Sequence, residues 1–302
     1  MATAIPGGVD FVVSRVALVA VDADFEMRQK FASVGDAALY VCELMAAVSV
    51  FYETEINMKL AASYIRIWDT AADPYTAPDT ETQLPQFKNY WEANMGSVPR
   101  NVAHLMSGRN LGGGRAYLEE MCGGSSAYGV SGNMSGSFPR PPQSGSDLNW
   151  DLIVVAHELG HNFGSPHTHC YSPPVDLCWT QEGGCAGGAP VCQQGTIMSY
   201  CHQCSGGLAN IDLTFGPTVS SWVQSQLVAC IGPARNPCFV NAAFGGTQQG
   251  TSTNPMRTVA RGTWYVLPGG TVSIVAGNYP EQMTICQPMR LTATGGTARI
   301  GQ

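Results

Sequence analysis

The chain has 302 residues, 44% of them hydrophobic, which is enough to bury a core and excludes an extended disordered protein. Its formal net charge is −7, and the three lysines, Lys30, Lys59 and Lys88, form no basic stripe, so we expect no nucleic-acid partner. No apolar run approaches the length needed to cross a bilayer, so we expect no membrane span.

The first half of the chain alternates predicted strands and helices. A β-branched run predicts a buried strand over 11–22, and apolar residues at helical spacing predict an amphipathic helix over 27–52. A strand over 58–68, a surface loop over 69–83, a helix over 84–96 and a short strand over 102–106 follow. This order favours an α/β fold with a mainly parallel sheet and right-handed crossovers.

The segment 125–138 is small and polar with scattered apolar residues, which favours an exposed edge strand; a plain surface loop is the alternative. Residues 150–159 are apolar around most of a helical circumference and predict a buried helix. Asp147 or Asn149 can cap its start.

This helix carries the motif H-E-x-x-H-x-x-G-x-x-H, from His157 to His167. His157 and His161 project from one helical face and can bind a single Zn²⁺, while Glu158 can reach a metal-bound water. Gly164 can adopt the left-handed conformation that ends a helix, which returns His167 as a third ligand. Three protein ligands leave one tetrahedral position open, as is typical of a catalytic zinc site.

These eleven residues resemble the metzincin zinc-peptidase signature, and the segment 196–200, T-I-M-S-Y, resembles the family's Met-turn. The body of the chain is similar to adamalysin- or reprolysin-like members. The resemblance implies a twisted sheet with a zinc helix, a disulfide-rich lower subdomain, and a substrate strand at 125–138. It also implies that Met198 forms an apolar floor beneath the histidines and that Cys122 pairs with Cys230.

Two positions depart from the adamalysin pattern. Thr168 follows the third histidine where adamalysins usually have Asp, and Tyr200 completes a Met-x-Tyr turn like that of astacin- and serralysin-like members. A tyrosine there can ligate zinc or donate to the oxyanion, so Tyr200 is a candidate catalytic residue; a hydrogen-bonded core tyrosine is the alternative. We interpret His104, His169 and His202 as loop or core histidines.

Eleven cysteines, six of them between Cys170 and Cys204, indicate an oxidising compartment and therefore a secreted, extracellular protein. The first residues lack the basic start and apolar core of a signal peptide, so we infer that a signal peptide and a pro-segment are missing from the sequence. The pair Cys201 and Cys204 could bind a second zinc or act in redox chemistry, but we favour disulfides. The odd total leaves a cysteine unpaired or bridged outside the chain, and Cys42 is a candidate buried thiol.

A last helix is predicted over 217–232, and the catalytic domain is expected to span 1–232. Residues 233–302 predict a small all-β module with strands at 264–267, 271–275, 283–285 and 290–294. The module resembles the first coils of a parallel β-helix; a small β module packed on the first domain is the alternative. About three strand pairs cannot form a stable solenoid alone, so we expect either that the module docks on the first domain or that the native chain continues with further coils.

Together these features predict a secreted zinc endopeptidase that hydrolyses proteins or peptides through a zinc-activated water, with Glu158 as general base. One Zn²⁺ is the expected cofactor, and no pattern identifies a structural Ca²⁺. One alternative is a catalytically silent scaffold that binds partners through its C-terminal module, although the intact Glu158 argues against it. Another is a zinc hydrolase acting on carbohydrate, but Glu281 is the tail's only acid.

Overall fold

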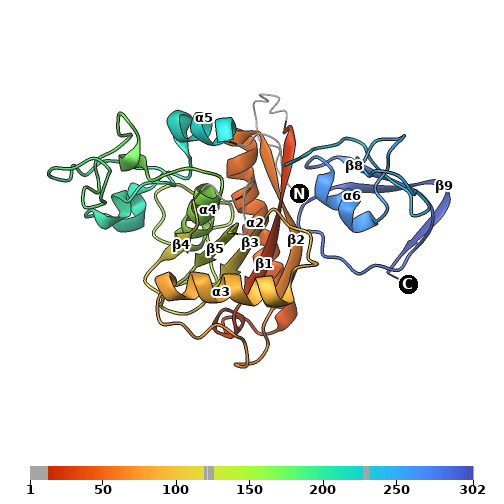
Figure 1. The fold of residues 1–302 in the computed structure, drawn as a ribbon, viewed down its shortest axis with the longest axis horizontal. Helices are drawn as coiled ribbons and strands as arrows, with labels where there is room; N and C mark the ends of the chain where they lie inside the picture. The colour runs from red at the N-terminus through yellow and green to blue at the C-terminus, as the bar shows by residue number, and fades with distance from the viewer. Residues whose placement is uncertain (1–12, 119–120, 122–125, 227–230, 302) are drawn as a thin grey trace.

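A six-stranded sheet forms the centre of this computed structural model, which describes residues 13–118, 121, 126–226 and 231–301 (Figure 1). The strand order is β2 (Met58–Ile67), β1 (Arg15–Ala23), β3 (Val102–Met106), β5 (Tyr128–Ser131) and β4 (Gly114–Ala116), and β6 (Gly232–Pro233) pairs with the start of β1. β4 and β6 are antiparallel to their neighbours, and the other pairs are parallel. The predicted mainly parallel α/β fold is confirmed.

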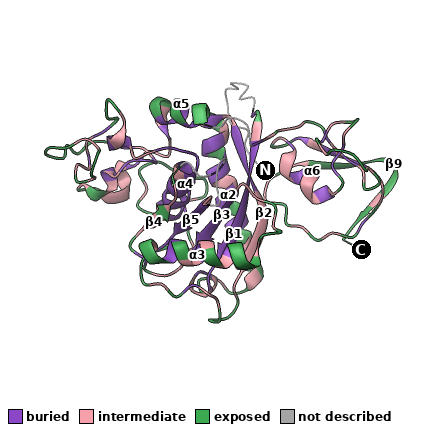
Figure 2. Ribbon diagram, in the orientation of Figure 1, coloured by how far each residue is buried: buried purple, intermediate pink, exposed green. Residues whose placement is uncertain are grey.

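Helices cover both faces of this sheet. Val19 and Val21 of β1 belong to one hydrophobic cluster with residues of α2 (Val34–Ile56) and α4 (Trp150–Asn162). Ala20 belongs to the opposite cluster, which includes Phe87 and Trp91 of α3 (Thr80–Asn94). Successive side chains of a strand point to opposite faces, so a strand buried on both faces is continuously apolar. Figure 2 shows that α4 and the central strands are buried.

The predicted strands 58–68 and 102–106 coincide with β2 and β3, but the first helix is divided. A short α1 (Phe25–Arg28) precedes α2, whose start is capped by Ser33, as its hydroxyl accepts from the Asp36 backbone N–H at 3.1 Å. α3 begins inside the predicted loop because Asp79 caps it, accepting from the Thr82 N–H at 2.8 Å. Local capping therefore sets both helix starts.

The edge strand predicted at 125–138 is wrong. Only β5 forms there, and it is buried between β3 and β4, so the edge of the sheet is β4. The small residues of β5 reflect close packing rather than exposure: a Cβ at Gly129 would lie 3.0 Å from His104 Nδ1 and 3.1 Å from Asn162 Oδ1.

By length and hydropathy alone, α2 would suffice to cross a membrane, contrary to the expectation that no apolar run approaches that length. Half of its most apolar window is buried inside the protein. Tyr40, Leu44 and Val48 contribute to the hydrophobic core, so α2 has the position of a core helix.

The C-terminal region contains a second, three-stranded parallel sheet of β7 (Cys238–Val240), β8 (Thr271–Tyr279) and β9 (Arg290–Ile300). The strand predicted at 264–267 is wrong, because α6 (Val259–Tyr265) occupies its first half, and residues 283–285 form no strand. The Glu281 carboxylate accepts from the N–H groups of Val259 and Ala260 at 2.7 and 2.9 Å, a long-range cap that no local pattern reveals. The region is therefore not purely β, and a domain boundary at 232 stays a prediction.

This region is attached to the first sheet at its edge strand β2 and to α2 (Figure 1). Cys42 forms a disulfide with Cys286, so the prediction of a free thiol at Cys42 is wrong; Cys238 is the free, buried cysteine among the described residues. Lys59 on β2 donates from Nζ to the carbonyls of Thr263 and Val266 at 3.2 and 2.8 Å. These contacts fit the expectation that the tail docks.

Three disulfides cross-link the segment after α4: Cys170–Cys185, Cys178–Cys201 and Cys192–Cys204. Both cysteines of the C-x-x-C pair are thus in disulfides, as we favoured. The expected Cys122–Cys230 pair falls outside the described residues. α5 (Gly216–Gln226) follows, and at Gly232–Pro233 the chain is already in β6 rather than in the predicted helix.

Candidate active site

The helix that carries the motif is α4, which is buried on nearly every side. Its first turn is anchored by Asp151, whose carboxylate accepts from the N–H groups of Ser135 and Gly136 at 2.8 and 2.9 Å and from the Tyr40 hydroxyl. Asn149 occupies the N-cap position but makes no side-chain cap, and its amide instead donates to the Gln143 carbonyl. An acidic group in the first turn is favourable because the helix dipole is positive there.

The structure brings His157, His161 and His167 together. The first two lie one helical turn apart on α4, and Gly164, at φ +93°, turns the chain so that the third returns to them. One nitrogen of each ring lies within 4.8 Å of the others, and the Nε2 atoms of His161 and His167 are 3.1 Å apart. This is the spacing of donors that surround one small cation.

The orientation of the rings fits a zinc ion. His157 Nδ1 lies 2.7 Å from the Ile197 carbonyl, and His161 Nδ1 lies 2.7 Å from the Ser165 carbonyl. A carbonyl only accepts, so each Nδ1 carries the proton and each Nε2 offers its lone pair. Burial lowers the pKa of His157 well below its usual range and that of His161 to about 3, which keeps both rings neutral as metal binding requires.

Glu158 lies beside the histidines with an unpaired carboxylate oxygen. Its Oε2 is buried and has no hydrogen-bond partner among the described residues. Burial raises the pKa of Glu158 well above its ordinary value, and the charge of Arg115 opposes that effect. Gly114 on β4 makes room for this group, because a Cβ there would overlap the Glu158 carboxylate. A desolvated carboxylate with a free oxygen is suited to proton transfer.

Met198 and Tyr200 lie beside the rings from the turn that follows the cysteine-rich segment. Met198 is fully buried, and a Cβ on Gly160, between the two helical histidines, would meet its Sδ at 2.5 Å. The Tyr200 ring centroid is 4.4 Å from that of His167. Burial, together with the charge of Glu158, raises the pKa of Tyr200 to about 12, so its hydroxyl keeps its proton at neutral pH.

A cleft extends on both sides of Glu158. On one side a cavity of about 580 Å³ lies between Gly112–Gly114 and the segment 199–203, with Trp150 and Trp179 in its walls. On the other side a cavity of about 340 Å³ is lined by Arg115, Pro166 and His167, among others. Gly114, Glu158 and Tyr200 line both cavities. An extended chain could therefore cross the site.

Residues 13–212 match the model of a family described as Reprolysin_5, Metallo-peptidase family M12. The chain belongs to this family. The match runs from before β1 to beyond Tyr200 and so includes every candidate site residue. Membership confirms the predicted likeness to reprolysin-like peptidases and implies a zinc ion, which the donor set above fits.

The chain is also similar in sequence to individual proteins. Disintegrin and metalloproteinase domain-containing protein 1a of Mus musculus is 30% identical over 178 residues, 56% of this chain and 21% of the mouse protein. Protein 1 of the same description from Rattus norvegicus is 34% identical over 134 residues, 42% of this chain and 16% of the rat protein. The chain thus spans about a fifth of these relatives. A solved structure, metalloproteinase-II from Bacteroides fragilis, overlaps 72% of this chain and 55% of that chain, with a TM-score of 0.38 and 13% identity.

Two contributors to this site, β4 and Glu182, were not predicted from the sequence. β4 is three residues long and has no periodic pattern. Glu182 lies 15 residues after His167 in a segment of turns, yet its Oε2 is 2.7 Å from His167 Nδ1. The signal that could have placed Glu182 is the spacing of Cys170 and Cys185, whose disulfide returns the chain to the third histidine.

Proposed function

We propose that this M12 peptidase is a zinc-dependent endopeptidase that cleaves proteins or peptides. The observation that carries the proposal is the unpaired carboxylate of Glu158, buried beside three metal-oriented imidazoles in a cleft. A buried carboxylate without a partner lowers the stability of the fold, and such groups occur mainly at functional sites; proton transfer to and from a substrate is the function we assign to it.

The chain's own groups have distinct tasks in this mechanism. Nε2 atoms of His157, His161 and His167 would hold the zinc ion, which, when bound, polarises the scissile carbonyl and lowers the pKa of the attacking water. Glu158 accepts the proton of that water and passes it to the leaving amine. The protonated Tyr200 hydroxyl donates a hydrogen bond as negative charge develops on the carbonyl oxygen. Met198 supports the histidines from below.

Substrate binding is assigned to β4 and the glycines before it. β4 is the terminal strand of the sheet, so one of its edges carries backbone groups that an extended peptide can pair with. The cavities on both sides of Glu158 accommodate residues before and after the scissile bond, which supports internal cleavage rather than trimming of chain ends.

Secretion is the second part of the proposal. Cys42–Cys286 and the three disulfides between Cys170 and Cys204 are typical of proteins that fold in an oxidising compartment. We therefore expect its substrates to be extracellular proteins.

Digestion of casein tests the proposal. The purified protein should cleave casein internally, lose that activity after zinc is stripped by a chelator, and regain it when Zn²⁺ is restored. A protein that binds zinc but cleaves neither casein nor gelatin would contradict the proposal and favour the catalytically silent scaffold.

A further inference from the structure

We propose that Glu182 is a positioning residue that orients the imidazole of His167 toward the metal. The inference rests on the proposed zinc site, and it assigns a function to a residue outside the H-E-x-x-H-x-x-G-x-x-H motif. It also assigns a supporting role to His169 and to the Cys170–Cys185 disulfide, which no part of the proposed mechanism uses.

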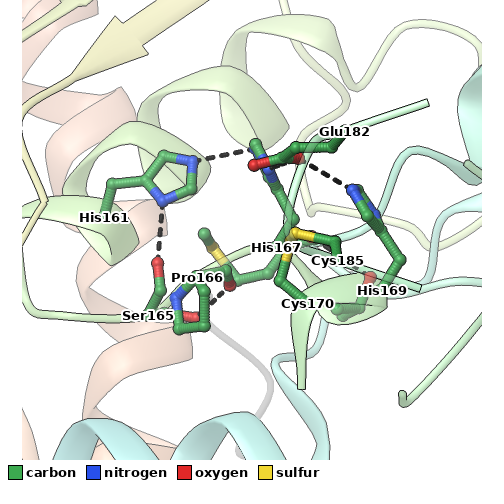
Figure 3. The surroundings of a disulfide bond; sticks show 10 residues. His161, Ser165, Pro166, His167, His169, Cys170, Glu182 and Cys185 are labelled. Carbon is green, nitrogen blue, oxygen red and sulfur yellow. Dashed lines mark hydrogen bonds and ion pairs between the residues drawn. A yellow bond between two sulfur atoms is a disulfide. The ribbon is translucent and has the colours of Figure 1, made fainter. Parts of the chain in front are cut away.

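His167 differs from the other two histidines in how its ring is held. His157 and His161 lie on α4, and each is oriented by a backbone carbonyl. His167 lies beyond the helix, in extended backbone with φ −63° and ψ 153°, and its Nδ1 meets the side chain of Glu182 at 2.7 Å (Figure 3). The third ligand therefore depends on a carboxylate for its orientation, where the other two depend on the main chain.

His169 holds that carboxylate from the other side. Its ring is fully buried, and its Nε2 lies 2.8 Å from the same oxygen of Glu182 that meets His167. The rings of His167 and His169 are nearly parallel, at 12° with centroids 5.3 Å apart, so both N–H groups converge on that oxygen (Figure 3). His169 Nδ1 has no partner among the described residues, which leaves Nε2 as the protonated nitrogen.

The disulfide brings Glu182 to this position. Cys170 and Cys185 join segments 15 residues apart in sequence, and the Cys185 N–H donates to the Glu182 carbonyl at 3.3 Å. The Ala186 N–H donates to the His169 carbonyl at 3.1 Å, which closes the same loop. A Cβ added at Gly183 or Gly184, beside Glu182, would meet nothing within 4 Å, so no other segment packs against that side of the turn.

A carboxylate behind a metal-binding imidazole fixes the ring and increases the basicity of its free nitrogen; loss of such a partner typically lowers metal affinity about 10- to 100-fold. We therefore expect Glu182→Ala to weaken Zn²⁺ binding by at least about 10-fold. Glu182→Gln, which keeps the shape and a neutral acceptor, should weaken it less. Removal of the disulfide in Cys170→Ser/Cys185→Ser should act in the same direction as Glu182→Ala.

The test is the dissociation constant for Zn²⁺, measured on the stripped full chain by competition with a chelating dye. The visible spectrum of the Co²⁺-loaded protein reports the geometry around the metal, which a purely structural role of Glu182 would leave unchanged. Gln181→Ala, an exposed neighbour on the same loop, is the matched control and should bind Zn²⁺ like the wild type.

The order wild type, Glu182→Gln, Glu182→Ala in falling affinity, with an altered Co²⁺ spectrum, supports the inference. Equal affinity within about two-fold in folded Glu182→Ala, or in folded Glu182→Gln if the alanine variant fails to fold, overturns it. Failure of the wild type itself to bind Zn²⁺ would contradict the proposed function, so the two failures are distinguishable.

Discussion

Gly114, on the edge strand of the sheet, leaves room for the side chain of Glu158, the proposed general base. It lies on β4 and lines the cavities on both sides of Glu158, at a position where a Cβ would overlap that side chain. Its φ is outside the left-handed region, so alanine can adopt the backbone conformation without strain. The effect of Gly114→Ala is therefore confined to the new methyl group, which would overlap three atoms of the Glu158 side chain.

To restore ordinary van der Waals contact, the Glu158 carboxylate must move by about 1 Å, and a displacement of that size in a catalytic group can lower the rate about 10²-fold. We expect Gly114→Ala to reduce kcat/KM for a quenched-fluorescence peptide by about that factor, or about 2.7 kcal/mol of transition-state stabilisation. The zinc content should stay at the wild-type level, because the three atoms nearest to the new methyl group all belong to Glu158 and none to a histidine.

Gly96→Ala is the matched control, since a Cβ at Gly96 would meet nothing within 4 Å. It should leave kcat/KM unchanged. A Gly114→Ala protein whose kcat/KM stays within about three-fold of the wild type would refute the placement of Glu158 against β4.

Three further outcomes are expected. Tyr200→Phe should lower kcat about 10²-fold with zinc content unchanged, and an unaltered kcat would reduce Tyr200 to a packing residue. Burial lowers the pKa of Lys59 from 10.5 to about 8, so between these pH values the folded protein binds fewer protons than the unfolded chain. The free energy of unfolding in urea, compared with that of Lys59→Met, should therefore rise by up to about 3 kcal/mol as the pH rises from 8 to 10.5. No relative rise would contradict the burial of Lys59. Cys42→Ser/Cys286→Ser should lower stability by about 2–5 kcal/mol, and an unchanged melting temperature would argue against docking of the tail.

The central sheet and the three histidines could be predicted because their determinants are local. The continuous apolar run of β1 and the four-residue spacing of His157 and His161 each follow from the period of one element. Gly164 likewise takes the positive φ that its position after the helix required. Each of these features is set by a few neighbouring residues.

The parts that could not be predicted depend on partners far away in sequence. Thr258 caps α6 locally, and Glu281 adds a second cap from about twenty residues away, so the aromatic and β-branched residues that favour a strand are overridden. Gly129 is small because His104 and Asn162 pack against it, which sequence alone cannot distinguish from exposure. The pairing of Cys42 with Cys286 spans 244 residues, and no spacing rule reaches that far.

The central claim is that Glu158 transfers the proton while the three histidines bind zinc, and Glu158→Gln separates the two functions. We measure zinc content and casein cleavage on the same preparation of that variant. The account predicts wild-type zinc content with turnover lowered by several orders of magnitude, because the amide cannot accept the proton. A zinc-loaded Glu158→Gln protein that retains substantial turnover would contradict the account.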